Sequence, residues 1–302
     1  MRKYTIRDFR RDFPDDAVCL EWLRNFLYPN GIECPLCKRV TKHHRVKSRP
    51  SYSCDFCGHH VHPAAGTIFE KSTTPLHLWF YAIFQMSATR CGMSAKQIQR
   101  ELGVTYKTAW RMWSQIRKLL AENVGTFSGP NPIEADETYI GGRRSFADRR
   151  DAARNRLRDK SVVAGQVQRQ GKLRATYLPE GAAGTLVPHI RKHILPSSII
   201  YTDELPAYKN LSRAGYIHRR VNHSAKVYVR GGVHTNTIEG FFGLLKRGIS
   251  GVYHSVSAKY LQRYLDEYAF RYNHRNDETP MFTSILRRVA DVPAGPPSQG
   301  LS

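Results

Sequence analysis

The spacing of apolar residues changes near residue 131 and divides the chain into two parts. Before it, apolar residues recur at helical intervals in DDAVCLEWLRNFL, residues 15–27, and from 75 to about 120. After it, three short segments within 131–179 predict strands, 185–194 predicts a helix, and SSIIYTDE predicts a further buried strand. This order predicts an α/β fold with a mixed sheet, in which the last strand runs parallel to the first.

The helical pattern that ends near residue 120 has the outline of a helix-turn-helix. Ser94 is placed to cap a first helix, Gly103 to make the turn, and Thr105 to cap a second helix. The second helix carries Tyr106, Lys107 and Arg111, which suit contacts with DNA phosphates and base edges. A plain helical hairpin with a solvated basic face is the alternative.

A later amphipathic helix combines apolar and chemically active positions in HTNTIEGFFGLLKR, residues 234–247. Asn236, Glu239, Gly243 and Lys246 share one face, and the large apolar residues fall on the other. Gly240 and Gly243 each cost the helix about 1 kcal/mol relative to alanine, which indicates close approach of another backbone or of a substrate. The apolar face is therefore predicted to pack against the protein core, and the polar face to carry the functional residues.

The net charge of the chain indicates what kind of partner it binds. The chain has 302 residues with 47 Lys and Arg against 25 Asp and Glu, a formal net charge of +22, so a polyanion such as nucleic acid is the expected partner. With 41% hydrophobic residues it can fill a core. It shows neither a signal peptide nor an apolar run of membrane-spanning length, so a cytoplasmic protein without membrane contact is expected.

Four of the six cysteines form two closely spaced pairs. Cys34 and Cys37 stand in CPLC, and Cys54 and Cys57 in CDFC, with sixteen residues between the pairs. Two such turns supply the four thiolates of a closed, structural Zn²⁺ site. Four unrelated buried thiols are the alternative. Gly58, just after the second pair, suits the positive φ that these turns often need.

Two aspartates stand near the ends of strands that the predicted topology makes neighbours. Asp136 lies in the first strand of the second part, and Asp203 lies at the carboxyl end of the last. Side chains at such strand ends meet at one edge of an open sheet, where two carboxylates make a divalent-metal site. The neighbouring Glu137 and Glu204 are expected on the opposite faces because side chains alternate along a strand. Glu239 is predicted to supply the third ligand.

Taken together, these motifs resemble a known family. The matching stretches are CPLC and CDFC, ADETYIGG, YTDE, HTNTIEGFFGLLKRGISGVYHSVS and YLDEYAFRYNHR, spanning roughly residues 20–276. They resemble the transposases of bacterial insertion sequences, of the ISXO-like group, that join an N-terminal zinc ribbon to a DDE-type, RNase H-like catalytic domain. In that family the catalytic aspartates match Asp136 and Asp203, and a lysine matches Lys246. The third position is Glu in some subgroups and Asn in others, so Glu239 and Asn236 both remain candidates.

The resemblance implies DNA cleavage and strand transfer by phosphoryl transfer with two Mg²⁺ or Mn²⁺ ions. Asp136 would bridge the ions, Asp203 would hold one, Glu239 or Asn236 the other, and Lys246 would contact DNA phosphate. The expected partner is double-stranded DNA, both the element ends and the target, bound by a homodimer or a larger assembly. A zinc-ribbon and helix-turn-helix regulator with an idle catalytic site, and a nuclease that does not join DNA, are the alternatives.

The sequence predicts four parts: an N-terminal helix with the zinc ribbon over 1–65, the helix-turn-helix region over 66–125, the catalytic domain over 126–285, and a disordered tail over 286–302. Within the catalytic part, the charge-dense segment 143–160 begins with Arg143 and Arg144. We expect this segment either to close over DNA or to be a solvated loop.

Overall fold

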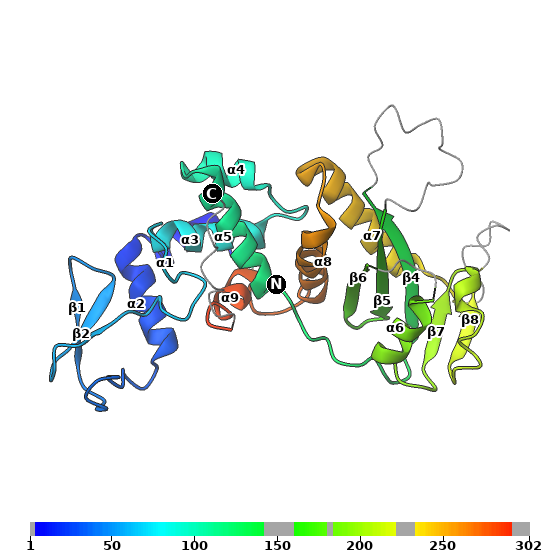
Figure 1. Ribbon diagram of the computed structural model, residues 1–302, viewed down its shortest axis with the longest axis horizontal. Coiled ribbons are helices and arrows are strands. Elements are labelled where there is room, and N and C mark those ends of the chain that lie inside the picture. Colours follow the sequence, from blue (N-terminus) through cyan, green and yellow to red (C-terminus); the bar gives the residue numbers. More distant parts are fainter. Residues whose placement is uncertain (1–3, 142–159, 180–183, 222–232, 292–302) are drawn as a thin grey trace. The chain divides into compact units, whose positions relative to one another are not determined.

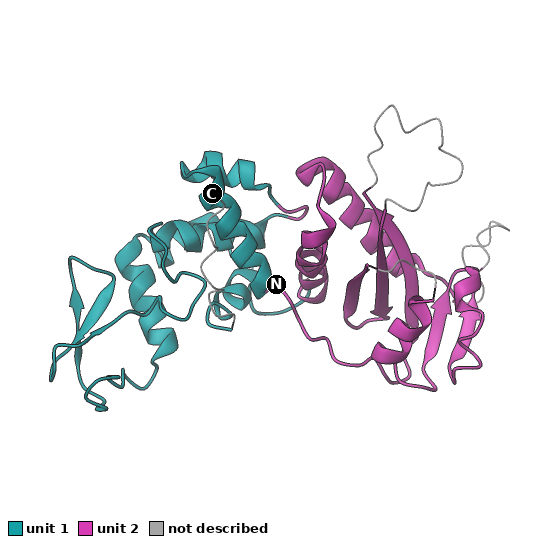
Figure 2. Cartoon of the chain, viewed as in Figure 1, with its two compact units in different colours: residues 1–89, 93–119, 276–302 teal, residues 90–92, 120–275 magenta. Residues whose placement is uncertain are grey.

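The computed structural model describes residues 4–141, 160–179, 184–221 and 233–291. By their internal contacts they form two compact units (Figure 2). Unit 1 comprises the described residues of 1–89, 93–119 and 276–302, and unit 2 comprises those of 90–92 and 120–275. The chain therefore leaves unit 1, builds unit 2 and returns. The four-part division of the sequence stays a prediction.

Unit 1 is an aromatic-rich helical core with a small sheet. Phe9 stacks on Phe84 with ring centroids 5.4 Å apart, and Phe282 meets Phe84 edge-on at 6.2 Å, which joins the last helix of the chain to the first. The helices are α1 (Ile6–Asp12), α2 (Asp16–Leu27), α3 (Leu76–Ala88), α4 (Ala95–Leu102), α5 (Tyr106–Leu119) and α9 (Met281–Leu286) (Figure 1). The sheet pairs β1 (His43–Val46), β2 (Ser51–Cys54) and β3 (His60–Val61) antiparallel, in that order.

The two helices of the expected helix-turn-helix are confirmed. The Ser94 hydroxyl accepts the Gln97 N–H at 3.2 Å and caps α4, which Gly103 ends in a left-handed conformation with φ 64°. The Thr105 hydroxyl accepts the Thr108 N–H at 3.2 Å at the start of α5. A turn of three residues, 103–105, thus joins two helices that pack against each other.

Unit 2 contains the predicted mixed sheet, with the strand order β6-β5-β4-β7-β8. Strands β4, β5 and β6 are antiparallel neighbours, whereas β7 pairs parallel with β4, and β8 parallel with β7. The expected parallel pairing of the first and later strands is confirmed. The strands are β4 (Ile133–Ile140), β5 (Ser161–Gln168), β6 (Leu173–Leu178), β7 (Ile199–Thr202) and β8 (Ile217–Arg220).

Helices cover both faces of this sheet, so the α/β fold class is also confirmed. On one face, Leu186 and Ile190 of α6 (Leu186–His193) join Ile133 and Ala135 of β4 in an apolar core that includes Tyr208 of η2 (Pro206–Tyr208). On the other face, α7 (Asn236–Gly248) and α8 (Ala258–Asn273) pack on β5 and β6, and the π-helix η3 (Ile249–Tyr253) connects them. Strand β4 therefore serves two cores, one on each side.

Among the residues that the structure describes, none of the helices is both long enough and apolar enough to span a lipid bilayer.

Candidate active site and zinc centre

The register of two parallel strands places the predicted aspartates next to each other. Ile133 pairs with Ile200 and Glu134 with Tyr201, and two steps further along both strands lie Asp136 and Asp203. A carboxylate oxygen of each lies within 4.8 Å of the other. Asp203 is held in place because its Oδ1 accepts the Leu205 N–H at 3.0 Å, where the chain turns away from β7. The expected meeting of the two carboxylates is confirmed, and it occurs where β7 ends beside the middle of β4.

Glu137 joins these two residues, which the alternation argument did not foresee. Its side chain does lie on the α6 face, where the Tyr208 hydroxyl donates to Glu137 Oε2 at 2.7 Å. Its carboxylate nevertheless comes within 4.8 Å of those of Asp136 and Asp203. Alternation fixes the direction of a Cα–Cβ bond, whereas the carboxylate at the end of a longer side chain can still come near groups from the other face, here beside the point where β7 ends. The predicted opposite face of Glu137 is thus confirmed, the choice of the two aspartates as metal ligands stays a prediction, and Glu137 is a further carboxylate beside them.

The electrostatics of the cluster favour a bound cation. Burial, followed by the charges of Glu137 and Asp203, raises the pKa of Asp136 to about 8. Burial also raises the pKa of Glu137, and Asp203 adds to that rise. Three carboxylates this close disfavour one another's ionised forms unless a positive charge lies among them. Their oxygens are the hard donors that Mg²⁺ and Mn²⁺ prefer, so this donor set fits a divalent metal.

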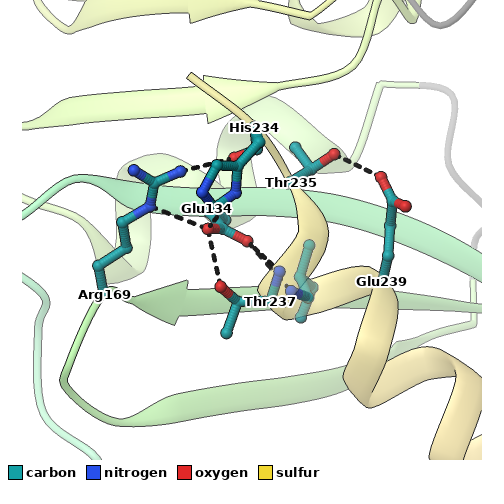
Figure 3. A network of polar contacts seen from close by, with 7 residues as sticks. Glu134, Arg169, His234, Thr235, Thr237 and Glu239 are labelled. Atoms are coloured by element: carbon teal, nitrogen blue, oxygen red, sulfur yellow. Dashed lines mark hydrogen bonds and ion pairs between the residues drawn. The ribbon is translucent and has the colours of Figure 1, made fainter. Parts of the chain in front are cut away.

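Helix α7 brings its predicted residues to the same face of the sheet as Asp136. Asn236, at its first position, and Glu239 and Lys246 are all exposed, as the helical wheel predicted. Glu239 lies outside the group of carboxylates within 4.8 Å, but its charge contributes to the raised pKa of Asp136. The Glu239 carboxylate accepts the Thr235 hydroxyl at 2.6 Å (Figure 3). The choice between Glu239 and Asn236 as third ligand stays a prediction.

The four paired cysteines converge as a zinc site requires. Cys34 Sγ lies 3.5 Å from Cys57 Sγ, and Cys37 Sγ lies 3.8 Å from Cys54 Sγ. A tetrahedron with Zn–S bonds of about 2.3 Å has sulfur–sulfur edges of about 3.8 Å, so the thiols present fit Zn²⁺. The Thr41 hydroxyl, 3.1 Å from Cys54 Sγ, lowers the pKa of that thiol and favours the thiolate.

The two cysteine turns have the same backbone shape. The Lys38 N–H donates to the Cys34 carbonyl at 2.9 Å, and the Gly58 N–H donates to the Cys54 carbonyl at 2.9 Å. Lys38 and Gly58 both have positive φ, 57° and 72°. The positive φ expected at Gly58 is confirmed, and the first turn takes the same conformation with a lysine.

Comparison with known proteins matches both parts of this arrangement. Residues 126–273 match the ISXO2-like transposase domain, and residues 14–60 match the transposase zinc-ribbon domain. The chain belongs to the ISXO2-like transposases. Its mixed sheet with helices on both faces is accordingly an RNase H-like catalytic fold, and the four cysteines are those of the family's zinc ribbon.

Two relatives support the family assignment. An uncharacterised protein in transposable element ISH50 of Halobacterium salinarum is 27% identical over 283 residues, covering 86% of this chain and 92% of that protein. An uncharacterised transposase-like protein of Haemophilus influenzae is 30% identical over 118 residues, 39% of this chain and 93% of that protein. A cryoEM structure of a simian T-cell lymphotropic virus intasome with PP2A regulatory subunit B56 gamma overlaps 68% of this chain and 73% of its own, with a TM-score of 0.31 and 14% identity, too weak a likeness for argument.

The transposase presents part of its predicted DNA-binding surface on α5. Tyr106 is 46% exposed, Lys107 is exposed, and Trp110 is 39% exposed. Trp110 is not among the DNA contacts that the sequence predicts. Ala109, Trp113 and Ile116 are buried at helical spacing, and Trp110 falls one position outside that series. This offset is the sequence signal that Trp110 is exposed.

The other predicted DNA contacts differ in accessibility. The Arg111 guanidinium donates to the Glu70 carbonyl at 2.9 Å and is only partly exposed, which gives this side chain a structural contact within unit 1. Arg143 and Arg144 lie outside the described residues. Tyr106 and Lys107 are therefore the predicted DNA-binding residues that the described structure shows at the surface.

Proposed function

We propose that this transposase cleaves DNA at the ends of its element and joins the freed 3′ ends to target DNA, using Mg²⁺ or Mn²⁺. The observation that carries the proposal is the cluster of Asp136, Glu137 and Asp203, where β7 ends beside the middle of the parallel strand β4, within a domain of the transposase family. Divalent metal, when bound, polarises the scissile phosphate and activates the attacking hydroxyl. Phosphoryl transfer needs little further chemistry from protein groups.

The residues of the site then have separate tasks. Asp136 and Asp203 would hold the metal where β7 ends beside β4, and Glu137, which accepts a hydrogen bond from Tyr208, would complete the negative cluster. Glu239 or Asn236 closes the site from α7. Lys246 is exposed on the same helix, seven residues after Glu239, and contacts a DNA phosphate.

The DNA ends are read by unit 1 in this proposal. The helix-turn-helix lays the first turn of α5 in the major groove, where Tyr106 and Trp110 contact apolar base edges and Lys107 contacts a phosphate. The Lys96 ammonium, 5.0 Å from the centre of the Tyr106 ring, adds positive charge beside this surface. Transposition needs two ends in one complex, so a homodimer or larger assembly forms on DNA. Such a protein acts in the cytoplasm of a bacterial cell.

Plasmid cleavage and joining tests the catalytic part. Purified protein is incubated with a supercoiled plasmid carrying the element ends, with Mg²⁺ or Mn²⁺, and nicked and joined products are scored. Asp203→Asn is expected to abolish both products. Glu204→Gln is the matched control, because it removes a carboxylate one position away and outside the metal cluster. Full activity of Asp203→Asn refutes the proposed site. Wild-type protein that nicks the plasmid but gives no joined products favours a nuclease.

A further inference from the structure

A fully buried carboxylate lies beside the active site without belonging to it. Glu134 is two residues before Asp136 on β4, is 0% exposed, and lies outside the metal cluster. Its side chain faces the start of α7 (Figure 3). Because side chains alternate along a strand, it lies on the same side of the sheet as Asp136. A buried carboxylate is stable only when hydrogen bonds replace its hydration, so Glu134 requires hydrogen-bond donors around it.

Glu134 takes most of these partners from the first turn of α7. The Thr237 and Ile238 N–H groups donate to Oε2 at 2.8 and 3.1 Å, and the Thr237 hydroxyl donates to Oε1 at 2.9 Å. These two N–H groups belong to the first turn of the helix, where no earlier turn can accept them. A carboxylate at this end also interacts favourably with the helix dipole. Glu134 thus caps α7 from a different element.

Charge from the turn that follows β5 completes the shell. The Arg169 Nε donates to Glu134 Oε1 at 3.0 Å, and Arg169 Nη2 donates to the His234 carbonyl at 3.1 Å, just before α7. The His234 Nδ1 lies 3.4 Å from Oε1. Charge-assisted hydrogen bonds of this kind are short and directional, so they allow little freedom of position.

The network extends from Glu134 to a predicted metal ligand. Thr235, 0% exposed, directly precedes α7, and its hydroxyl donates to Glu239. Glu134 sits on the strand that carries Asp136, and its donors sit on the helix that carries Asn236 and Glu239. The Glu134 carboxylate therefore connects β4 to α7, and the distance between these two elements sets the size of the proposed metal site.

We propose that Glu134 is a positioning residue that fixes the third metal ligand relative to Asp136. The inference rests on the proposed function, because it requires that α7 contribute to metal binding. Glu134→Gln keeps the shape of the side chain but cannot keep all of its hydrogen bonds. An amide has one acceptor oxygen, so its NH₂ group must face either the helix N–H groups or the guanidinium, donor against donor.

Metal affinity gives a readout that a purely structural role would not move. Mn²⁺ binding to the folded full-length protein is measured by calorimetry or by electron paramagnetic resonance. Glu134→Gln is expected to weaken binding about 10- to 100-fold, as for other residues that orient metal ligands. Glu267→Gln is the matched control: Glu267 is also 0% exposed and paired with an arginine, at 2.9 Å, but within α8. Equal weakening in both variants overturns the proposal.

A double-mutant cycle tests whether Glu134 acts through α7. Glu134→Gln is combined with Glu239→Ala and, separately, with Asn236→Ala. The double variant that includes the true ligand is expected to bind Mn²⁺ no more weakly than that ligand's single variant. Additive losses with both partners overturn the proposal. If Glu134→Gln does not fold, Thr237→Ala, which removes one hydroxyl donor, must lower the affinity in the same direction, and unchanged affinity overturns the proposal.

The wild-type protein separates the two hypotheses. Wild type that binds no Mn²⁺ contradicts the proposed function itself. Wild type that binds Mn²⁺, together with Glu134→Gln that binds it equally well, contradicts only the positioning role.

Discussion

Gly165→Ala should disturb the active site through packing alone. Gly165 lies on β5 directly opposite Asp136, and α7 crosses over it. A Cβ added there would lie 2.6 Å from Ile238 Cδ1 and 2.6 Å from Phe242 Cζ. Carbon atoms are at their best separation near 3.5–4.0 Å, so α7 must move away from the sheet by about 1 Å, or two buried side chains must leave their places.

The expected effects follow from that displacement. Overpacking a core by one methyl group costs about 1–3 kcal/mol of unfolding free energy. A shift of about 1 Å in catalytic geometry costs about 100-fold in rate. Since Ile238 and Phe242 flank Glu239 on the first turns of α7, the loss of strand transfer should exceed what the loss of stability alone explains.

Urea denaturation and a strand-transfer assay, run on the same preparations, test this reasoning. Gly251→Ala is the matched control, because its added Cβ meets nothing within 4 Å among the described residues. It should stay within about 0.5 kcal/mol of wild type, with unchanged activity. Gly165→Ala with wild-type stability and wild-type strand transfer would refute the close packing of α7 on β5.

Three further predictions concern charge, zinc and DNA. Burial raises the pKa of Asp136 from an ordinary 3.8 to about 8, so the metal-free native state binds more protons than the unfolded state between these two pH values. The unfolding free energy of the wild type should therefore fall as pH rises from about 4 to about 8. Urea titrations of Asp136→Asn should lack this fall. Cys54→Ser should lower bound zinc, measured by atomic absorption, and weaken DNA binding, while leaving Mn²⁺ affinity unchanged. Lys107→Ala should weaken DNA binding and reduce its salt slope by about 1, whereas Arg111→Ala should chiefly lower the melting temperature; equal salt slopes in the two variants would contradict the assignment.

Rules of strand order were enough to predict that the two aspartates of the candidate site meet. Asp136 and Asp203 were predicted together because parallel strands place their carboxyl ends at one edge, and the register confirms it. The cysteines were predicted because their spacing alone encodes a zinc site. In both cases the information lies in local sequence and in a general rule of topology.

The missed residues depend on information that local sequence does not carry. Glu137 has its carboxylate near those of Asp136 and Asp203 although its side chain starts on the opposite face, a proximity that alternation alone does not describe. Glu134 meets its helix donors across more than 100 residues of chain. Arg111, whose DNA contact stays a prediction, also donates to the Glu70 carbonyl, 41 residues earlier in the chain. Such pairings are set by tertiary packing.

Glu134 also bears on the register that forms the site. Side chains of β4 alternate between two environments: Ile133 and Ala135 lie in the apolar core on the α6 side, whereas Glu134 meets polar donors on the α7 side. A slip of one residue would move Glu134 into that apolar core without donors, at a cost of several kcal/mol. The same slip would part Asp136 from Asp203. The register that satisfies the buried carboxylate is thus also the register that brings the predicted metal ligands together, so folding and the proposed catalysis depend on the same pairing of β4 with its neighbours.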